Sequence, residues 1–331
     1  MKQLVEGFVQ QLQHAREIGE GASVAFNKKD FKEVVIAGMG GSGIGGNIIQ
    51  SYVSDKLQVP VIVNKSYDIP AFVGPDTLFL ASSFSGNTEE TLSGVRAAME
   101  KGATLACVTS GGELLRIARE NELPHIVIPG DSKQPRACLG YSLVEMLYLL
   151  HYSGLLNETF KTELDQTINL LQDKSGSIKV HASALANAFK DKLPIIYAGA
   201  GFEPVAIRTQ QQINENSKQL CHVNAFPEMN HNEIVGWLYP EQLYKQLAVV
   251  FIRTSYDHDR VKLRMDLCKG IFESKAGNVM EVEAQGATFL EQVFYLVHLF
   301  DWVSVYLAEL NDVDPNSIDN INYLKGELSK V

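Results

Sequence analysis

Short apolar runs alternate with segments of helical periodicity along the whole chain. In the first half, these runs occupy residues 33–37, 59–63, 77–81, 104–108 and 126–128. Their length and nearly unbroken apolar character are typical of strands that are buried on both faces of a parallel sheet. Apolar residues at helical spacing lie between most of them. This alternation predicts right-handed βαβ crossovers in a doubly wound sheet.

The second half of the chain repeats this pattern. The predicted strands are residues 194–198, 220–224, 247–253 and 278–282, and the predicted helices are 158–173, 177–191, 257–272 and 288–310. A glycine-containing turn follows the first of these strands, as a longer glycine run follows the first strand of the chain. We therefore predict an α/β fold with two doubly wound domains, 1–155 and 156–331, each a mostly parallel sheet flanked by helices.

The net charge narrows the classes of partner. The 331 residues carry a formal net charge of −10, and the pI is near 5.3. A protein that coats nucleic acid or an anionic membrane needs a basic face. The amino terminus has no apolar core of signal-peptide length, and runs such as 247–252 are too short to span a bilayer. We expect no nucleic-acid partner, no membrane association and a cytoplasmic location.

Metal and disulfide chemistry find little support in the sequence. The four cysteines form no C-x-x-C pair and are typical of reduced core residues; they are Cys107, Cys138, Cys221 and Cys268. None of the eight histidines belongs to an H-E-x-x-H motif, and the triplet His231-Asn232-Glu233 lacks a spaced partner. We expect no bound metal.

A hydroxyl-rich turn at residues 82–91 joins a predicted strand to a predicted helix. The N-terminus of a helix offers unpaired N–H groups and a partial positive charge, which suit a phosphate. Ser83, Ser85 and Thr88 supply three hydroxyl groups there. The structural alternative is that Thr88 is an N-cap and that residues 85–87 form an ordinary turn. The turn alone leaves both interpretations open.

A glycine run at residues 38–46 follows the first predicted strand. Its G-x-G-x-x-G spacing begins at Gly41 and has the strand-to-helix context of a dinucleotide-binding fingerprint. That fingerprint expects an acidic residue at the end of the second strand, where this chain has Asn64-Lys65-Ser66. A glycine turn with Ser42 can also serve a sugar phosphate, because both ligands need close approach to main-chain N–H groups. A NAD-binding Rossmann enzyme is the less favoured alternative.

Together these motifs resemble the sugar isomerase (SIS) domain family, whose members bind phosphorylated sugars. The glycine run and residues 82–91 are motifs that all SIS proteins share. Further motifs resemble the bifunctional phosphoglucose/phosphomannose isomerases, a branch with two SIS domains, and the resemblance covers nearly the whole chain in the right order. These motifs are Gln134-Pro135-Arg136, Asn214-Glu215-Asn216-Ser217-Lys218, Asn230-His231-Asn232-Glu233 and Leu324-Lys325.

The resemblance implies a role for each candidate site residue. Glu215 would be the catalytic base, His231 would open the sugar ring, and Arg136 and Lys325 would complete the pocket. In related isomerases the histidine arrives from the partner subunit, which implies a homodimer with His231 donated across the interface. The residues that would hold the phosphate are Gly41, Ser42, Ser83, Ser85 and Thr88.

The start of the final helix departs from the family pattern. Many members have Asp-Pro-Thr there, whereas this chain has Asp314-Pro315-Asn316. If the threonine of the family helps to accept the mannose epimer, Asn316 changes the balance between the two aldose phosphates. The resemblance therefore does not settle the preferred epimer.

The reaction that this family performs needs no redox cofactor. Exchange between an aldose phosphate and a ketose phosphate moves a proton between C2 and C1 through a cis-enediol, after the ring has opened. A partly buried carboxylate can reach both carbons, a histidine suits ring opening, and a fixed cation such as Arg136 stabilises the enediolate. Each residue also has a structural interpretation. Glu215 could pair with Lys218, His231 and Arg136 could be surface residues, and Lys325 could be a C-terminal helix cation.

Two further classes of function remain open. SIS domains also serve as non-catalytic sugar-phosphate sensors in regulators, although this acidic chain has no appended helix-turn-helix module. Amide transfer to make an amino sugar is weaker, because no glutaminase domain with an N-terminal cysteine is present. In every case the expected ligand is a small sugar phosphate, and we expect no cofactor.

Overall fold

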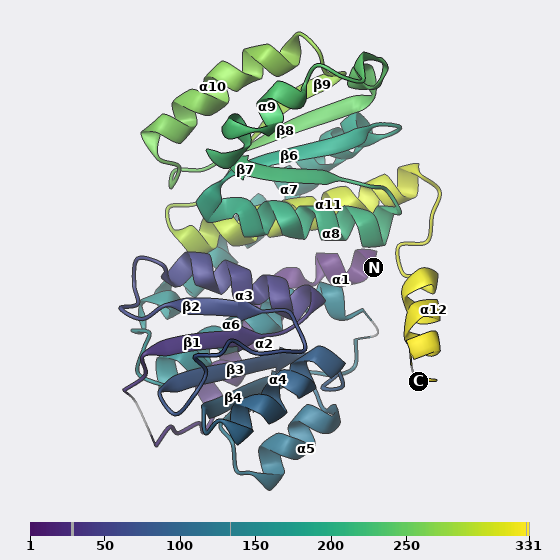
Figure 1. Ribbon diagram of the computed structural model, residues 1–331. Helices are drawn as coiled ribbons and strands as arrows, with labels where there is room; N and C mark the ends of the chain where they lie inside the picture. Colours follow the sequence, from purple (N-terminus) through teal and green to yellow (C-terminus); the bar gives the residue numbers. More distant parts are fainter. Residues whose placement is uncertain (28–29, 133, 329, 331) are drawn as a thin grey trace. The chain divides into compact units, whose positions relative to one another are not determined.

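The chain folds into two compact α/β units (Figure 1). A computed structural model describes residues 1–27, 30–132, 134–328 and 330. The N-terminal unit comprises Glu6–Asp173 and Gly286–Phe294, and the C-terminal unit comprises Met1–Val5, Lys174–Gln285 and Tyr295–Val331. The division of the sequence into domains 1–155 and 156–331 stays a prediction, because compactness alone does not define a sequence domain.

The N-terminal unit is built on a five-stranded parallel sheet of order β2-β1-β3-β4-β5. All seven residues of β3 are buried, as expected for a central strand covered on both faces. The predicted strand positions are therefore confirmed to within two residues at each end. The strands are β1 (Glu33–Ala37), β2 (Val61–Asn64), β3 (Thr77–Ser83), β4 (Thr104–Thr109) and β5 (His125–Val127).

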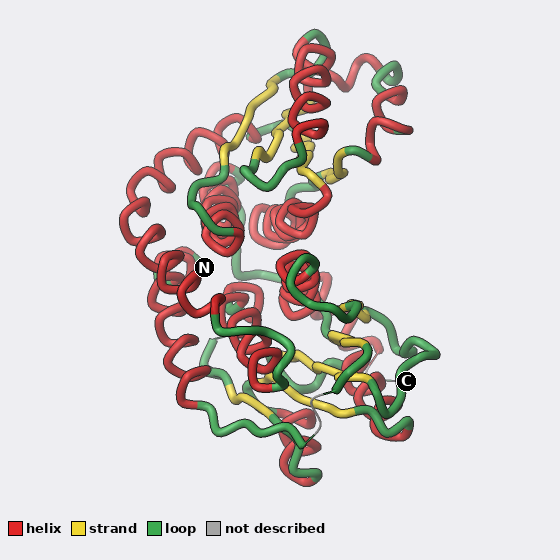
Figure 2. Tube along the Cα trace, turned by 90° about the vertical axis from the view of Figure 1, so that its left-hand side faces the viewer, coloured by secondary structure: helices red, strands yellow, loops and turns green. Residues whose placement is uncertain are grey.

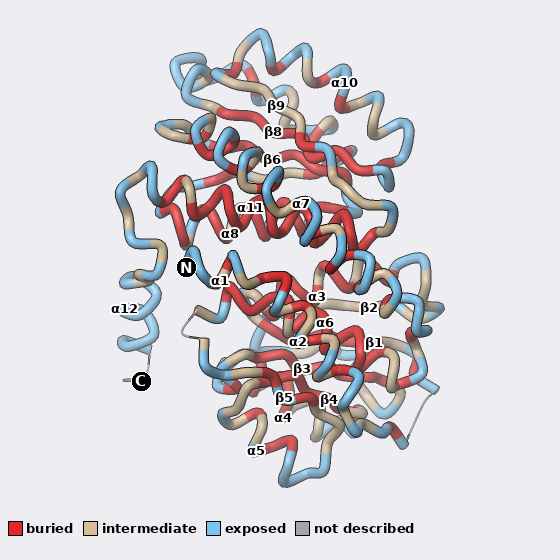
Figure 3. The backbone as a smooth tube through the Cα atoms, turned by 180° about the vertical axis from the view of Figure 1, so that it is seen from behind, coloured by how far each residue is buried: buried red, intermediate tan, exposed pale blue. Residues whose placement is uncertain are grey.

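Helices cover both faces of this sheet. On one face α6 packs against α2 and α3, and on the other α4 and α5 close a core that contains Phe79, Val95 and Ile117. Figure 3 shows α6 almost entirely buried, which fits its apolar sequence. The bounds are α2 (Phe8–Gly21), α3 (Gly40–Val53), α4 (Glu89–Glu100), α5 (Gly112–Glu120) and α6 (Leu139–Tyr152).

The C-terminal unit has a four-stranded parallel sheet of order β7-β6-β8-β9, which is the same order as the first four strands of the other sheet. Helices again lie on both sides of the strands (Figure 2). The shared order agrees with the predicted repetition. The strands are β6 (Leu193–Gly199), β7 (His222–Phe226), β8 (Leu247–Arg253) and β9 (Asn278–Glu283), and the main helices are α7 (Thr159–Phe189), α8 (Glu203–Ser217), α10 (Asp259–Glu273) and α11 (Phe289–Leu310).

Three predicted elements differ from the structure. The helices predicted at 158–173 and 177–191 are one continuous helix, α7, because Gly176 weakens a helix by only about 1 kcal/mol and buried apolar residues continue on either side of it. The helical spacing of apolar residues from about residue 2 to 26 predicts one helix, whereas the structure divides it at Gly7 into α1 (Lys2–Glu6) and α2. Most of the predicted glycine turn forms the first turns of α3.

Helix α11 is long and apolar enough to cross a bilayer by length and composition alone. In its most apolar stretch, 83% of the residues are buried within the protein. A core helix of a globular protein passes the same test, and the sequence predicts such a buried helix at residues 288–310. Its hydrophobicity is therefore accounted for by packing.

A carboxyl group without a partner lies in the core of the N-terminal unit. Glu145 on α6 is fully buried, and neither of its side-chain oxygens has a hydrogen-bond partner among the described residues. Burial raises the pKa of Glu145 from 4.5 to about 9. The side chain is therefore a neutral acid at pH 7, held in an apolar site that penalises its ionisation.

This buried acid predicts a pH-dependent stability. The folded state binds the Glu145 proton more tightly than the unfolded state, so the free energy of unfolding falls as pH rises from 4.5 towards 9. Glu145→Gln removes the titration, and the stability of this variant relative to wild type should increase by about 3 kcal/mol between pH 5 and pH 7.5. Urea unfolding at both pH values measures this. A difference that does not change with pH contradicts the assignment, and exposed Glu100→Gln is the control.

Candidate sugar-phosphate site

The strand order of the N-terminal unit places a topological switch point, called the crevice here, at the carboxyl ends of β1 and β3. Strands β1 and β3 are neighbours, but the chain leaves β1 towards β2 through α3 and leaves β3 towards β4 through α4, on the opposite face. Doubly wound sheets bind ligands at such a switch point, beyond the carboxyl ends of the strands. The glycine run follows β1 and the hydroxyl turn follows β3, so both predicted motifs lie at this point.

Main-chain atoms pack closely at this crevice. A Cβ atom on Gly38 would lie 2.9 Å from the Ser82 carbonyl oxygen, and one on Gly43 would lie 2.5 Å from the Gly38 carbonyl oxygen. Only glycine fits at such distances, because no real Cβ atom approaches main chain so closely. The glycines therefore bring the start of α3, including buried Ser42, against the end of β3.

Hydroxyl groups and main-chain N–H groups organise the turn after β3. The Oγ of Ser83 lies 2.9 Å from the Oγ1 of Thr88 and accepts a hydrogen bond from the N–H of Gly86 at 3.1 Å. The Oγ of Ser85 accepts from the N–H of Asn87 at 3.2 Å. Gly86 has a φ of +69°, and a Cβ there would lie 1.8 Å from the Gly111 carbonyl oxygen. Glycine is therefore required at this position.

Thr88 stands at the N-cap position of α4 without capping it. Among the described residues, its side chain accepts no hydrogen bond from the main chain of α4 and instead contacts the hydroxyl of Ser83. The structural alternative of an ordinary N-cap is therefore wrong for this side chain. Its hydroxyl faces Ser83 within the turn, where both groups can serve an anion.

Arg136 lies beside the glycine run in a short helical turn, η1 (Pro135–Ala137). Its residue surface is only 6% exposed, so the interpretation as a surface arginine is wrong. A Cβ on Gly41 would lie 3.8 Å from the Arg136 Cα. The buried residue Arg136 therefore lies beside the first turn of α3. All five predicted phosphate-binding residues and Arg136 thus lie in the same unit.

Lys65 is a further cation at this crevice that the sequence analysis did not assign. It follows β2, its ammonium group donates to the Oδ1 of Asn47 on α3, and its Cε lies 3.1 Å from the position of a Cβ on Gly43. Partial burial lowers the pKa of Lys65. Lys65 stands where a dinucleotide-binding fold has the acid that binds the ribose. The absence of that acid from the sequence is the signal that could have pointed to Lys65.

The equivalent crevice of the C-terminal unit contains an acid instead. Strands β6 and β8 are neighbours there, and Asp257 from the turn after β8 lies at the end of β6. A Cβ on Gly199 would lie 2.3 Å from its Oδ1, and its Oδ2 accepts the Thr254 N–H at 2.7 Å. Burial raises the pKa of Asp257. In the C-terminal unit, a carboxylate of the protein thus lies at the position equivalent to the one that would suit a phosphate in the N-terminal unit.

Glu215 lies on α8, which buried polar groups hold against α11. An Nη2 of Arg208 lies 3.3 Å from both carboxylate oxygens of Asp301, and Gln212 donates to the Oδ1 at 2.8 Å. One turn further along α8, Asn216 donates to the Oγ of Ser304 at 2.9 Å. Removing one partner of a buried pair leaves a charge without compensation, so these contacts fix the rotation and register of α8.

The carboxyl-terminal end of α8 leaves Glu215 half-buried beside these anchors. The ammonium group of Lys218 donates to the main-chain carbonyl of Glu215 at 2.6 Å. Lys218 has a left-handed φ of 54° and ends the helix. Glu215 thus stands at a rigid helix end, which is a suitable place for a group that must keep its position.

The other two predicted catalytic residues of the C-terminal unit are exposed. His231 ends η3 (Glu228–His231), after β7. Lys325 lies in α12 (Asp319–Leu328), none of whose described residues is buried, as Figure 3 shows. Before α12, Asn316 donates to the Oδ1 of Asp314 at 2.9 Å and accepts from the amino terminus, so its side chain supports the local turn.

The predicted site residues therefore fall into two sets. The phosphate-binding set and Arg136 lie in the N-terminal unit, whereas Glu215, His231 and Lys325 lie in the C-terminal unit. Within the part of the chain that the structure describes, no three His, Cys, Asp or Glu side chains are grouped as metal ligands are.

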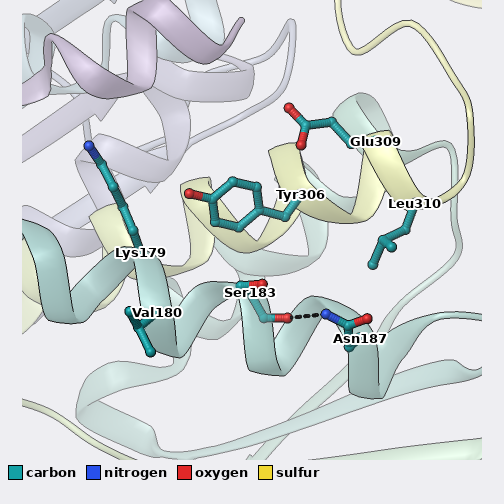
Figure 4. Close-up of a pocket in the computed structure, with 7 residues that line it drawn as sticks. All are labelled: Lys179, Val180, Ser183, Asn187, Tyr306, Glu309 and Leu310. Carbon is teal, nitrogen blue, oxygen red and sulfur yellow. Dashed lines mark hydrogen bonds between the residues drawn. The ribbon is translucent and has the colours of Figure 1, made fainter.

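An open groove of about 630 Å³ lies elsewhere, between α7 and α11 (Figure 4). It is lined by aliphatic and aromatic surface together with Lys179 and Glu309, and Glu309 is paired with Lys2 at 2.8 Å. The amide of Asn187 donates within its own helix to the carbonyl of Ser183 at 2.8 Å. None of the predicted site residues lines this groove, so volume does not identify the site.

Fold and crevice together define a protein built from SIS domains. The family described as "Bacterial phospho-glucose isomerase C-terminal SIS domain" matches residues 178–328. A solved structure of a putative phosphosugar isomerase from Clostridium difficile 630 superposes with a TM-score of 0.75 over 95% of each chain, at 16% identity, which supports the fold.

Two relatives narrow the family. The chain is 39% identical to the bifunctional phosphoglucose/phosphomannose isomerase of Caldicellulosiruptor bescii, over 100% of this chain and 99% of that relative. It is 36% identical to the protein of the same description from Aquifex aeolicus, over 99% of this chain and 98% of that one. The chain belongs to the bifunctional phosphoglucose/phosphomannose isomerase family.

Proposed function

We propose that the protein interconverts glucose 6-phosphate, mannose 6-phosphate or both with fructose 6-phosphate, without a metal, through ring opening and a cis-enediol intermediate. The observation that carries this proposal is the crevice between β1 and β3, where hydroxyl groups, helix N-termini and buried Arg136 gather around one place. Such a place suits a phosphate dianion. The names of the relatives supply the sugar and the type of reaction.

Each residue then has a defined task. The main chain at Gly41, the hydroxyl groups of the crevice and Lys65 hold the phosphate. Glu215 takes the proton from one carbon and returns it to the neighbouring carbon. The guanidinium of Arg136 stabilises the negative charge of the enediolate. His231 passes protons to and from the ring oxygen and the anomeric hydroxyl, and Lys325 adds a second cation.

We further propose that the active protein is a homodimer in which His231 serves the partner's pocket. His231 is exposed, and the chain that follows it carries exposed apolar side chains at Val235, Leu238 and Tyr239, which are 67%, 55% and 82% exposed. Helix α10 adds an apolar stripe at i, i+4 and i+8 spacing, formed by Leu263, Leu267 and Ile271. Exposed apolar surface of this extent suits contact with a second copy of the chain. A cytoplasmic location stays an expectation.

The first prediction concerns the reaction itself. The purified protein should convert fructose 6-phosphate to at least one of the two aldose phosphates in the presence of a chelator, because the assigned groups move protons without a metal. Coupled assays on all three sugars measure this, and the side-by-side rates give the epimer preference. Binding of sugar phosphate without turnover would favour the sensor function, and titration with NAD tests the Rossmann alternative.

The second prediction isolates the base. Glu215→Gln should keep the dissociation constant for sugar phosphate within about twofold and lower solvent-proton exchange at C2 by about 100-fold or more, since general-base groups contribute at least that much. Calorimetry and deuterium incorporation measure the two quantities. Glu203→Gln, at the exposed start of the same helix, is the matched control. Exchange that survives in the Glu215 variant removes Glu215 from the role of base.

The third prediction tests donation across the interface. Glu215→Gln and His231→Asn homodimers should each keep a measurable residual activity of about 1% of the wild-type value or less, and a mixture exchanged through refolding should recover about a quarter of wild-type activity. Random pairing makes half of the dimers hybrid, and each hybrid has one pocket with both native residues. Light scattering checks that dimers form. If dimers form and no activity returns, both residues of a pocket come from the same chain.

A further inference from the structure

The segment that carries His231 is fastened on its amino-terminal side by Asn230. The Oδ1 of this residue accepts a hydrogen bond from Arg264 Nη1 at 3.2 Å, and its Nδ2 lies 3.1 Å from the Sγ of Cys268. Both partners belong to α10, a helix of fifteen residues that packs on the sheet through its buried face. The residue immediately before the exposed histidine is thus tied to a rigid element.

The carboxylate of Glu233 fastens the other side. It starts α9 (Glu233–Gly236), accepts from Tyr197 and Asn224 at 2.5 Å each, and lies 3.0 Å from the Nε2 of His222. Tyr197 is on β6, and the other two partners are on β7. The indole N–H of Trp237 donates to the Tyr197 hydroxyl at 3.3 Å and completes the cluster. Three donors from two strands therefore converge on the two oxygens of one carboxylate.

The cluster stabilises the ionised form of Glu233. Burial opposes that charge, but hydrogen bonds from His222, Tyr197 and Asn224 together hold the pKa of Glu233 below its ordinary value. The hydrogen bond to Glu233 in turn raises the pKa of His222. The Glu233 side chain is only 20% exposed, so these bonds are stronger than those of a surface ion pair.

From this geometry we propose that Glu233 is a positioning residue for His231: its carboxylate locks the segment 228–236 onto β6 and β7 and so sets where the imidazole stands. The proposal rests on the proposed function, in which His231 opens the ring. Glu233 itself touches no substrate. It acts by removing conformational freedom from the histidine before the sugar binds, which lowers the barrier of a step that needs exact placement.

The chemistry of the cluster explains why a carboxylate is required there. An amide of the same size has one acceptor oxygen and one N–H₂ group, so it cannot accept from donors on both sides. In Glu233→Gln at least one of the three donors faces the N–H₂ group of the glutamine, which is also a donor. The attachment of segment 228–236 to the sheet therefore loosens, although the side-chain volume does not change. This variant therefore perturbs the placement of His231 and leaves the packing of the aromatic core in place.

A double-mutant cycle tests the proposal. Glu233→Gln should lower kcat about tenfold or more in the native background and less than about twofold in a His231→Asn background, since a residue that acts only through His231 has nothing further to lose there. Binding of sugar phosphate, measured by calorimetry, should stay unchanged. Equal losses in the two backgrounds would mean a general structural role and would overturn the proposal.

A control variant and a second measurement distinguish failure of the positioning role from failure of the proposed function. Glu228→Gln makes the same charge change in the same segment, where the carboxylate accepts from Asn232, and should have little effect on kcat. Amide hydrogen exchange of residues 228–236 should speed up in Glu233→Gln and not in Glu228→Gln. Unchanged exchange together with native kcat refutes the positioning role. A wild-type protein without turnover refutes the proposed function instead, and exchange still tests the anchor.

Discussion

Direct contact between main-chain segments at the N-terminal sheet edge is the constraint on which the phosphate crevice depends. The turns after β1, β3 and β4 touch each other without side chains between them: Gly38 lies over the Ser82 carbonyl, Gly86 over that of Gly111, and Gly112 over that of Ser85. This packing leaves the hydroxyl groups of Ser83 and Thr88 facing one another. It also brings the segment that leads into α3 against the end of β3. A single methyl group at any of these glycines would move a whole turn.

The C-terminal unit relies on a different means of rigidity. The end of α8 that carries Glu215 is held by buried polar pairs between α8 and α11, such as Arg208 with Asp301. The segment that carries His231 is held by the Glu233 cluster. Polar anchors of this kind specify one register, because any slip leaves a buried donor or charge without a partner. Close main-chain packing positions the groups proposed to bind the phosphate, and polar anchors position the groups proposed to react.

Local sequence patterns were enough to predict much of the fold. Strands such as β1 and β8 were predicted at their observed bounds, because a short apolar run between turns has few other solutions. Helix α7 was predicted as two helices, since only tertiary packing shows that the positions around Gly176 stay buried. The burial of Arg136 depends on segments distant in sequence, such as the glycine run. The same holds for the contacts of Lys65 and Glu233, whose partners lie on other elements.

The acid at the second crevice has a consequence for stoichiometry. The two sheets share one strand order, yet Asp257 supplies its own carboxylate at the end of β6, where a second phosphate would otherwise find a place. Like charges exclude each other at such short range. If the N-terminal crevice holds the phosphate as proposed, each chain would bind one sugar phosphate there and none at the end of β6.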